Sequence, residues 1–215
     1  MLAITGGKGG AGKTTVTLAL ACSLADAGRD PVALDADVDM PDLHVLADAA
    51  RQPTADDLAA GRLLDAVVQR PRRLPGIGVV AAGRPDSVPA ALSRLRGWHG
   101  PVLVDCPAGA SEDAAGPLRE CDGSVLVTTD SPAAIEDSVK TAAVARRLDA
   151  VPLAVLVRGE TGAAERAFDC PVTEVPSVDA SPVCTDPRIR AVCASIRRRI
   201  PDYGPPAGRG SRYHG

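Results

Sequence analysis

Aromatic side chains are scarce in this 215-residue chain, at 2% of its residues, although hydrophobic residues make up 45%. The core must therefore be built from alanine, valine and leucine. A chain of this length fits one ordinary α/β domain with a substantial core. We expect a single domain over residues 1–200, followed by a flexible Pro/Gly-rich tail over residues 201–215.

Long apolar runs are also absent, and none approaches the roughly 20 residues that span a bilayer. The first residues lack a charged segment followed by an apolar one, so no secretory signal is expected. Both absences favour a cytoplasmic protein. The net charge of −3 argues against a surface that binds nucleic acid everywhere, although a local basic patch is still compatible with it.

The chain has six cysteines but no C-x-x-C pair. A structural metal site normally needs tighter clustering of its ligands. Buried, reduced thiols in a cytosolic protein are the favoured interpretation.

Lysine is the rarest cation, because only Lys8, Lys13 and Lys140 accompany 21 arginines among the 24 cationic residues. Two of the three lysines lie five residues apart in the stretch "GGKGGAGKTT", residues 6–15. Their position among glycines needs a chemical explanation.

Apolar segments and segments with helical spacing alternate along the chain. The alternation predicts a mainly parallel twisted sheet with helices on both faces, a doubly wound α/β fold. Ligands of such sheets bind beyond the carboxyl ends of the strands. The expected strands are 2–5, 31–37, 76–82, 100–109 (running into a loop), 123–129, 151–157 and 170–175, and the expected helices are 13–28, 54–68, 87–98, 131–148 and 187–200.

Residues 7–14, "GKGGAGKT", match the phosphate-loop pattern G-x-x-x-x-G-K-[ST] between an expected strand and an expected helix. Glycines let backbone N–H groups wrap a polyphosphate, and the helix N-terminus adds its positive dipole end. Lys13 is expected to reach the β- and γ-phosphates, and the Thr14 hydroxyl to ligate Mg²⁺. The residues expected to hold the nucleotide here are Gly7, Lys8, Gly9, Gly10, Ala11, Gly12, Lys13, Thr14 and Thr15.

The stretch "KGGAGKTT" resembles the deviant Walker A motif of the ParA/MinD family of P-loop ATPases. The resemblance covers about residues 2–200 and implies ATP and Mg²⁺ as cofactors. It also implies an ATP-dependent homodimer, in which Lys8 reaches across to the partner's phosphates. A compact ammonium on a flexible stem suits a tight loop better than a planar guanidinium, which explains why lysine persists at these positions.

Carboxylates follow two other expected strands. In "ALDADVDMPDLH", residues 33–44, the resemblance assigns Asp37 to position the attacking water and Asp35 to the vicinity of Mg²⁺. It assigns no role to Asp39. In "PVLVDCPAG", residues 101–109, it implies that Asp105 holds Mg²⁺ through water and that the N–H of Gly109 senses the γ-phosphate.

The base site departs from the family pattern, which usually has Asn-Arg where this chain has Val157-Arg158. The side chain that reads adenine in the family is therefore missing. Arg158 could stack on the base, or backbone groups of residues 175–180, around Pro176, could read it.

Three functions share this chemistry. The first is an ATPase of spatial organisation or partitioning of a cellular cargo, slow and stimulated by an unidentified protein partner. Proteins of this kind bind to a cellular surface. The tail of this chain lacks an apolar face, which argues against direct membrane binding. Three arginines near the end of the last helix could contact non-specific DNA or could simply complement the helix dipole: Arg197, Arg198 and Arg199. The second is a metal- or cofactor-maturation ATPase with Cys106 at the dimer interface. The third, a regulator with negligible turnover, is disfavoured by Lys13, Asp37 and Asp105.

Overall fold

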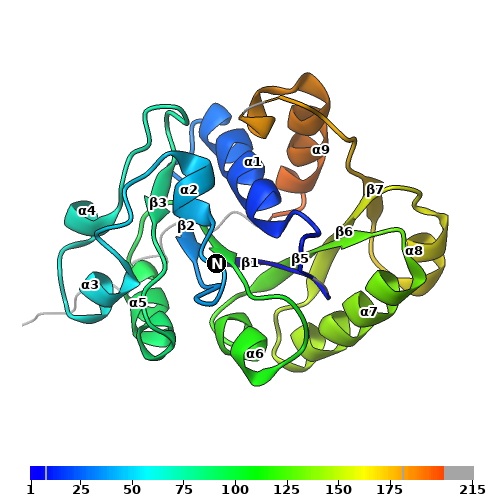
Figure 1. Cartoon of the computed structure of the whole chain (residues 1–215), viewed down its shortest axis with the longest axis horizontal. Helices are drawn as coiled ribbons and strands as arrows, with labels where there is room; N and C mark the ends of the chain where they lie inside the picture. The colour runs from blue at the N-terminus through cyan, green and yellow to red at the C-terminus, as the bar shows by residue number, and fades with distance from the viewer. Residues whose placement is uncertain (8, 181, 201–215) are drawn as a thin grey trace, which may run out of the picture.

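A seven-stranded sheet forms the centre of the protein in the computed structural model, which describes residues 1–7, 9–180 and 182–200. All neighbouring strands are parallel, in the order β3-β2-β4-β1-β5-β6-β7, which confirms the expected fold class (Figure 1). Lys8 and the expected tail at 201–215 lie outside the described residues. The strands are β1 (Leu2–Thr5), β2 (Val32–Asp35), β3 (Gly78–Val80), β4 (Val102–Asp105), β5 (Gly123–Thr129), β6 (Pro152–Arg158) and β7 (Val172–Glu174).

Helices cover both faces of the sheet because the central strands are apolar on both sides. In β1, Leu2 and Ile4 join one buried cluster, whereas Ala3, which points the other way, joins another. The alternation follows from the two-residue period of a strand. No face of these central strands is therefore left to solvent.

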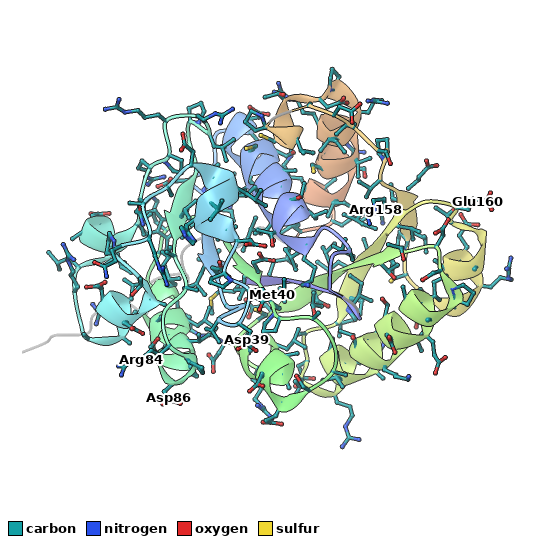
Figure 2. All side chains as sticks on the ribbon, viewed as in Figure 1. Asp39, Met40, Arg84, Asp86, Arg158 and Glu160 are labelled. Carbon is teal, nitrogen blue, oxygen red and sulfur yellow. The ribbon has the colours of Figure 1, made fainter. Side chains whose placement is uncertain are left out.

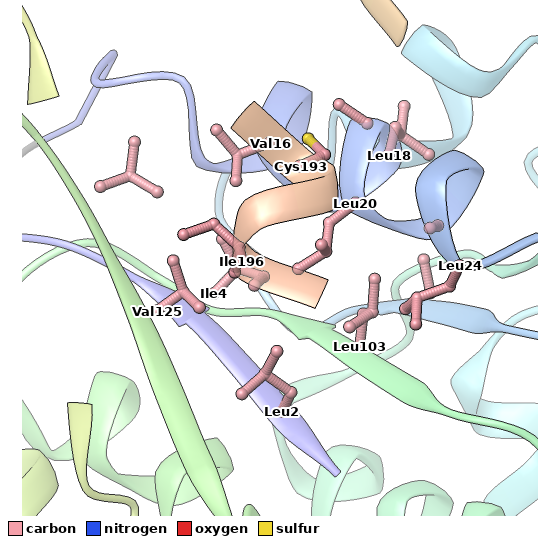
Figure 3. Close-up of a cluster of buried hydrophobic side chains, with 14 of the residues drawn as sticks. Leu2, Ile4, Val16, Leu18, Leu20, Leu24, Leu103, Val125, Cys193 and Ile196 are labelled. Carbon is pink, nitrogen blue, oxygen red and sulfur yellow. The ribbon is translucent and has the colours of Figure 1, made fainter. Parts of the chain in front are cut away.

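One face is covered by α1 (Lys13–Asp26), α2 (Leu43–Ala47) and α9 (Pro187–Arg197), which Figure 1 shows on the same side of the sheet. Figure 3 shows the core between them, with Leu20 of α1 and Ile196 of α9 close to the strands. The first and last helices of the described chain thus share one apolar core. This face becomes important because α1 begins at the phosphate loop.

The other face carries the middle helices of the chain, whose apolar residues pack in two further clusters. The helices are α3 (Ala55–Ala59), α4 (Leu64–Val67), α5 (Val88–Leu95), α6 (Glu112–Leu118), α7 (Pro132–Arg147) and α8 (Gly162–Ala167).

The single helix expected over 54–68 is wrong. The structure has two short helices there, separated by Gly61 at a φ of 95°. Thr54 does cap the first of them, as expected, by accepting a hydrogen bond from the N–H of Asp56. Sequence reasoning also missed α2, α6 and α8, which span only five to seven residues and give little periodic signal.

The strand order turns at β1, which lies between β4 and β5. The chain leaves β1 toward β2 on one side and later builds β5, β6 and β7 on the other. Ligands of open α/β sheets bind at such a switch point, so the loop after β1 is the expected site. Within the part of the chain that the structure describes, no helix has the length and apolar character needed to cross a membrane.

Candidate functional site

The loop between β1 and α1 takes a conformation that needs glycine at two positions. Gly10 and Gly12 have φ angles of 77° and 100°, where residues with a Cβ are strained. Gly12 is also the residue that precedes the first turn of α1. The loop therefore leads directly into the N-terminus of α1, where backbone N–H groups and the helix dipole favour the binding of an anion.

Gly7, in the same loop, is needed for close packing. A Cβ on Gly7 would lie 2.3 Å from the Asp137 carbonyl carbon and 2.4 Å from the Ser138 nitrogen, both in the backbone of α7. The Gly7 N–H also donates to the Ser138 hydroxyl at 3.3 Å. By contrast, a Cβ on Gly9 would meet nothing within 4 Å. The loop is anchored on one side and open on the other.

Lys13 and Thr14 occupy the first turn of α1. The Lys13 residue is only 7% exposed, which is unusual for lysine in a protein without a specific role for its charge. Behind it, the hydroxyl of Thr17 donates to the Lys13 carbonyl at 3.0 Å and lies 3.3 Å from Oδ1 of Asp105. The first turn of α1 is thereby tied to the end of β4.

Asp35 and Asp105 end two neighbouring strands and pair directly across them. Burial, together with the nearby charge of Asp105, raises the pKa of the Asp35 carboxyl to about 8. Burial also raises the pKa of Asp105 to about 6, although hydrogen bonds from Thr14 and Thr17 and the charge of Lys13 act in the opposite direction. Two desolvated carboxyl groups side by side form a place where a cation is favoured.

Asp35 has a further task that the sequence did not indicate. Its Oδ1 accepts the N–H of Asp37 at 3.1 Å, and its Oδ2 accepts the N–H of Leu43 at 3.1 Å. The carboxylate therefore shapes the whole segment between β2 and α2. Asp37 itself is half-exposed at the mouth of the site, where its Oδ1 accepts the N–H of Met40 at 3.2 Å.

Gly109 follows β4 at a φ of 94°, a conformation that favours glycine. Its N–H donates to the Gly6 carbonyl at 2.8 Å. This N–H is already engaged, so the phosphate-sensing contact expected for it would require that bond to break. The observed bond instead joins the loop after β4 to the loop after β1.

A cavity of about 260 Å³ opens beside the loop and is walled mainly by apolar side chains. Its position next to the helix N-terminus suits the base of a nucleotide whose phosphates occupy the loop. Arg158 stands at one side of it, and its Nη2 donates to the Gly10 carbonyl at 3.3 Å (Figure 2). The residues expected at the nucleotide that line this cavity are Ala11, Gly12, Thr15, Arg158 and Pro176.

Val157, which stands where the family usually has Asn, is fully buried in the cluster under α7 and α8, on the opposite face of the sheet. Strand alternation instead directs Leu156 and Arg158 to the cavity. The departure from the family pattern thus lies at a residue that does not border the cavity, whereas Arg158, which agrees with the pattern, does.

The structure bears on two surface roles weighed from the sequence, because Cys106 is buried and Arg197 is engaged within the fold, whereas Arg198 and Arg199 are exposed. Cys106 is fully buried in the core under α5 and α6, so it cannot present a metal ligand at a dimer interface. Arg197 donates through Nη1 to the Ser23 carbonyl at 2.7 Å and thereby holds α9 against α1. Among the described residues, no cluster of three His, Cys, Asp or Glu side chains is arranged to hold a metal ion.

Thr17 and Ser138 are the contributors that sequence reasoning missed. Both are fully buried polar residues inside helices. Thr17 lies one helical turn after Lys13, and a hydroxyl on an apolar helix face is the signal that could have revealed it. Ser138 gave no such signal, because its partner Gly7 is distant in sequence.

A strand, a glycine loop opening a helix, a buried lysine and two carboxylates at adjacent strand ends define a P-loop nucleotide-binding protein. The CobQ/CobB/MinD/ParA nucleotide-binding domain matches residues 2–157. The chain belongs to this family.

Several known sequences are similar to it. An uncharacterised ATP-binding protein of Methanocaldococcus jannaschii is 29% identical over 209 residues, covering 90% of this chain and 77% of that protein. The antiactivator FleN of Pseudomonas aeruginosa is 31% identical over 64% of this chain and 53% of its own length. The septum site-determining protein MinD of Synechocystis is 26% identical over 64% of this chain and 56% of its own. The chain thus spans about half the length of FleN and this MinD.

Solved structures with the same fold include MinD of Pyrococcus horikoshii complexed with Mg-ADP, at a TM-score of 0.74 and 24% identity, covering 94% of this chain and 88% of that one. The MinC:MinD cell division complex of Aquifex aeolicus gives a TM-score of 0.77 at 19% identity, covering 92% and 94%. Cobyrinic acid a,c-diamide synthase of Mycobacterium smegmatis gives 0.72 at 18% identity, covering 92% and 93%. At these identities the likeness concerns the fold.

Proposed function

We propose that this protein is a ParA/MinD-like ATPase that binds ATP with Mg²⁺, dimerises on ATP and acts as a switch in the spatial organisation of a cellular cargo. The loop after β1 carries the proposal, because its glycines leave an open cradle next to the buried Lys13. The names of its relatives support the choice of function, since FleN is an antiactivator and MinD a septum site-determining protein.

The oxygen ligands at the strand ends fit Mg²⁺, which binds through one or two carboxylates together with substrate phosphates. In this proposal the Thr14 hydroxyl would ligate the ion, Asp105 would hold it through water, and Asp35 would lie in its vicinity. The raised pKa values of both carboxyl groups follow from their desolvation, so a divalent cation would relieve the repulsion between their charges. Bound Mg²⁺ would neutralise charge on the phosphates.

The remaining chemistry belongs to side chains at the mouth of the loop. Lys13 stabilises the negative charge on the β- and γ-phosphates. The Thr17 hydroxyl contacts both the Lys13 carbonyl and Asp105, and so fixes the position of Lys13 relative to Asp105. Asp37 is exposed enough to accept a hydrogen bond from a water and to aim it at the terminal phosphate. Phosphoryl transfer of this kind depends on positioning and electrostatics, and hydrolysis is expected to be slow until a protein partner completes the site.

In this proposal, Lys8 makes the contact with the second subunit on which ATP-induced dimerisation depends. Lys8→Ala should leave the fold and part of the ATP affinity intact but abolish ATP-induced dimerisation, because only the ammonium that reaches the second subunit is lost. Light scattering with and without Mg-ATP measures the effect. Lys140→Ala is the matched control, because Lys140 is exposed on α7 and bridges Glu136 at 3.0 Å and Asp137 at 3.3 Å. A dimer that persists in Lys8→Ala with ATP would contradict the assignment.

Base discrimination is expected to be weak. The cavity beside the loop offers mostly apolar side chains and no side-chain amide, and such a site cannot strongly reject a related base. The phosphates supply the stronger, charge-assisted bonds, so ATP and GTP should bind within about tenfold, or about 1.4 kcal/mol. Titration of both nucleotides with Mg²⁺ decides the matter. An ATP preference of about a thousandfold would mean that backbone groups around 176–179 read adenine.

A further inference from the structure

Three cysteines that are far apart in sequence meet between α1, α9 and the short 3₁₀ helix η2 (Val183–Thr185). Cys22 lies in α1, Cys184 in η2 and Cys193 in α9, and all three belong to the same apolar cluster. Figure 3 shows Cys193 on α9 beside Val16 and Leu18 of α1. All three are free thiols, and Cys193 is buried as expected, whereas Cys22 and Cys184 are only partly buried.

The spacing along α1 explains why Cys22 faces η2. Thr15 and Ala19 line the same small cavity as Cys184, and one further turn along that face brings the helix to Cys22. The turn after that carries Asp26, which pairs with Arg190 of α9 at 2.6 Å. One face of α1 thus contacts η2 and α9 along its length.

The two half-buried thiols lie on neighbouring elements, Cys22 on α1 and Cys184 on η2, and pack against the same cluster. Both residues are partly open to solvent, whereas Cys193 is buried. We propose that Cys22 and Cys184 form an oxidation site, closing reversibly to a disulfide that ties η2 to α1.

The two sulfurs differ in reactivity, which defines the order of events. Interaction with the neighbouring Cys22 thiol lowers the pKa of Cys184, with Arg190 acting in the same direction and Asp26 against it. The same interaction, together with burial, raises the pKa of Cys22. Burial raises the pKa of Cys193 to about 12, so this thiol stays protonated near neutral pH. Cys184 is therefore the nucleophile.

The oxidant is a hydroperoxide, and hydrogen peroxide serves as the probe. The Cys184 thiolate attacks one peroxide oxygen, the O–O bond breaks, and Cys184 sulfenic acid and hydroxide form. The sulfur of Cys22 then displaces the sulfenic hydroxyl, giving the S–S bond, and the thiol proton leaves with that hydroxyl as water. Two thiols and one peroxide thus become one disulfide and two waters. Reduction by a small thiol restores the pair.

The disulfide would act on the nucleotide cavity. Val183, the residue before Cys184, lines that cavity, and so do Gly12, Val16 and Ala19 of α1. A covalent tie between η2 and α1 would fix two walls of the cavity relative to each other. This consequence rests on the proposed function, whereas formation of the disulfide does not.

The test begins with the reduced full chain in stoichiometric hydrogen peroxide at neutral pH, followed by alkylation and non-reducing peptide mass spectrometry. The expected result is loss of two of the six thiols and a single cross-linked peptide joining Cys22 and Cys184. Cys22→Ser and Cys184→Ser should form no cross-link. Cys170→Ser, which removes a thiol on the opposite face of the sheet, should form it as the wild type does.

Retention of all six thiols, oxidation of Cys184 alone, or a cross-link between another pair would overturn the proposal. Circular dichroism of each variant before oxidation verifies that it is folded. A fluorescent adenine nucleotide then measures the effect on the cavity, with slower release expected from the oxidised wild type and recovery after dithiothreitol. A cross-link that forms without changing release would leave the oxidation site standing and overturn only its link to the nucleotide.

Discussion

Asp37→Ala protein is expected to bind Mg-ATP as tightly as the wild type but to hydrolyse it at least about a hundredfold more slowly. The phosphate loop and the carboxylates of Asp35 and Asp105 remain in place, so the ground-state contacts are kept. What is lost is the carboxylate proposed to position the attacking water, and loss of an interaction used mainly in the transition state lowers turnover rather than affinity. Steady-state phosphate release and nucleotide titration measure the two quantities separately.

Two matched variants separate the role of this carboxylate from its neighbourhood. Asp37→Asn retains an oxygen for the N–H of Met40 but has no negative charge, so it should be as slow as Asp37→Ala. Asp39→Ala removes an exposed acid two residues away and should hydrolyse ATP at the wild-type rate. Wild-type turnover in Asp37→Ala would show that another group positions the water.

Gly7→Ala is expected to destabilise the fold by about 3 kcal/mol, the cost of forcing an extra group into a packed site. The new methyl would overlap backbone atoms of α7 at 2.3 and 2.4 Å, and a backbone cannot move aside as a flexible side chain can. For a chain of this size, such a loss lowers the melting temperature by roughly 10 °C. Nucleotide binding should fall as well, because the loop must shift away from α7.

Gly9→Ala provides the control two residues away in the same loop. A Cβ there would meet nothing within 4 Å, and Gly9 does not have a positive φ. Its melting temperature should stay within about 2 °C of the wild type. Equal destabilisation by both substitutions would mean that the loop does not depend on the contact between Gly7 and α7. Thermal unfolding followed by circular dichroism makes the comparison.

Much of the site could be predicted from the sequence because each of its parts is a short contiguous motif. The loop over residues 7–14 is a contiguous pattern between a strand and a helix, so its place at the sheet edge follows from local order. Asp35 and Asp105 each close an apolar strand, and parallel strands bring their carboxyl ends to one edge. The seven strands were equally visible, since buried parallel strands are continuous apolar runs.

The parts that the sequence did not reveal depend on neighbours that are distant along the chain. Thr17 bridges to Asp105, Gly7 packs on Ser138, and these contacts exist only once α1, β4 and α7 are assembled. Short helices such as α6 offered too few residues for a periodic signal. Val157 lies away from the cavity and Arg158 borders it, because a one-residue difference along a strand changes the face on which a side chain lies.

The sequence by itself determined the chemistry of this protein: a phosphate loop with two lysines, carboxylates after two strands, and a nucleotide-binding family. Local composition was enough, because the glycine loop and each strand-end acid are recognised within a short contiguous stretch of sequence. Only the tertiary structure decided which face each strand residue takes, that Arg158 rather than Val157 borders the cavity, and that Cys22 meets Cys184. Those outcomes depend on the packing of α1 against η2 and α9, elements separated by more than half of the chain.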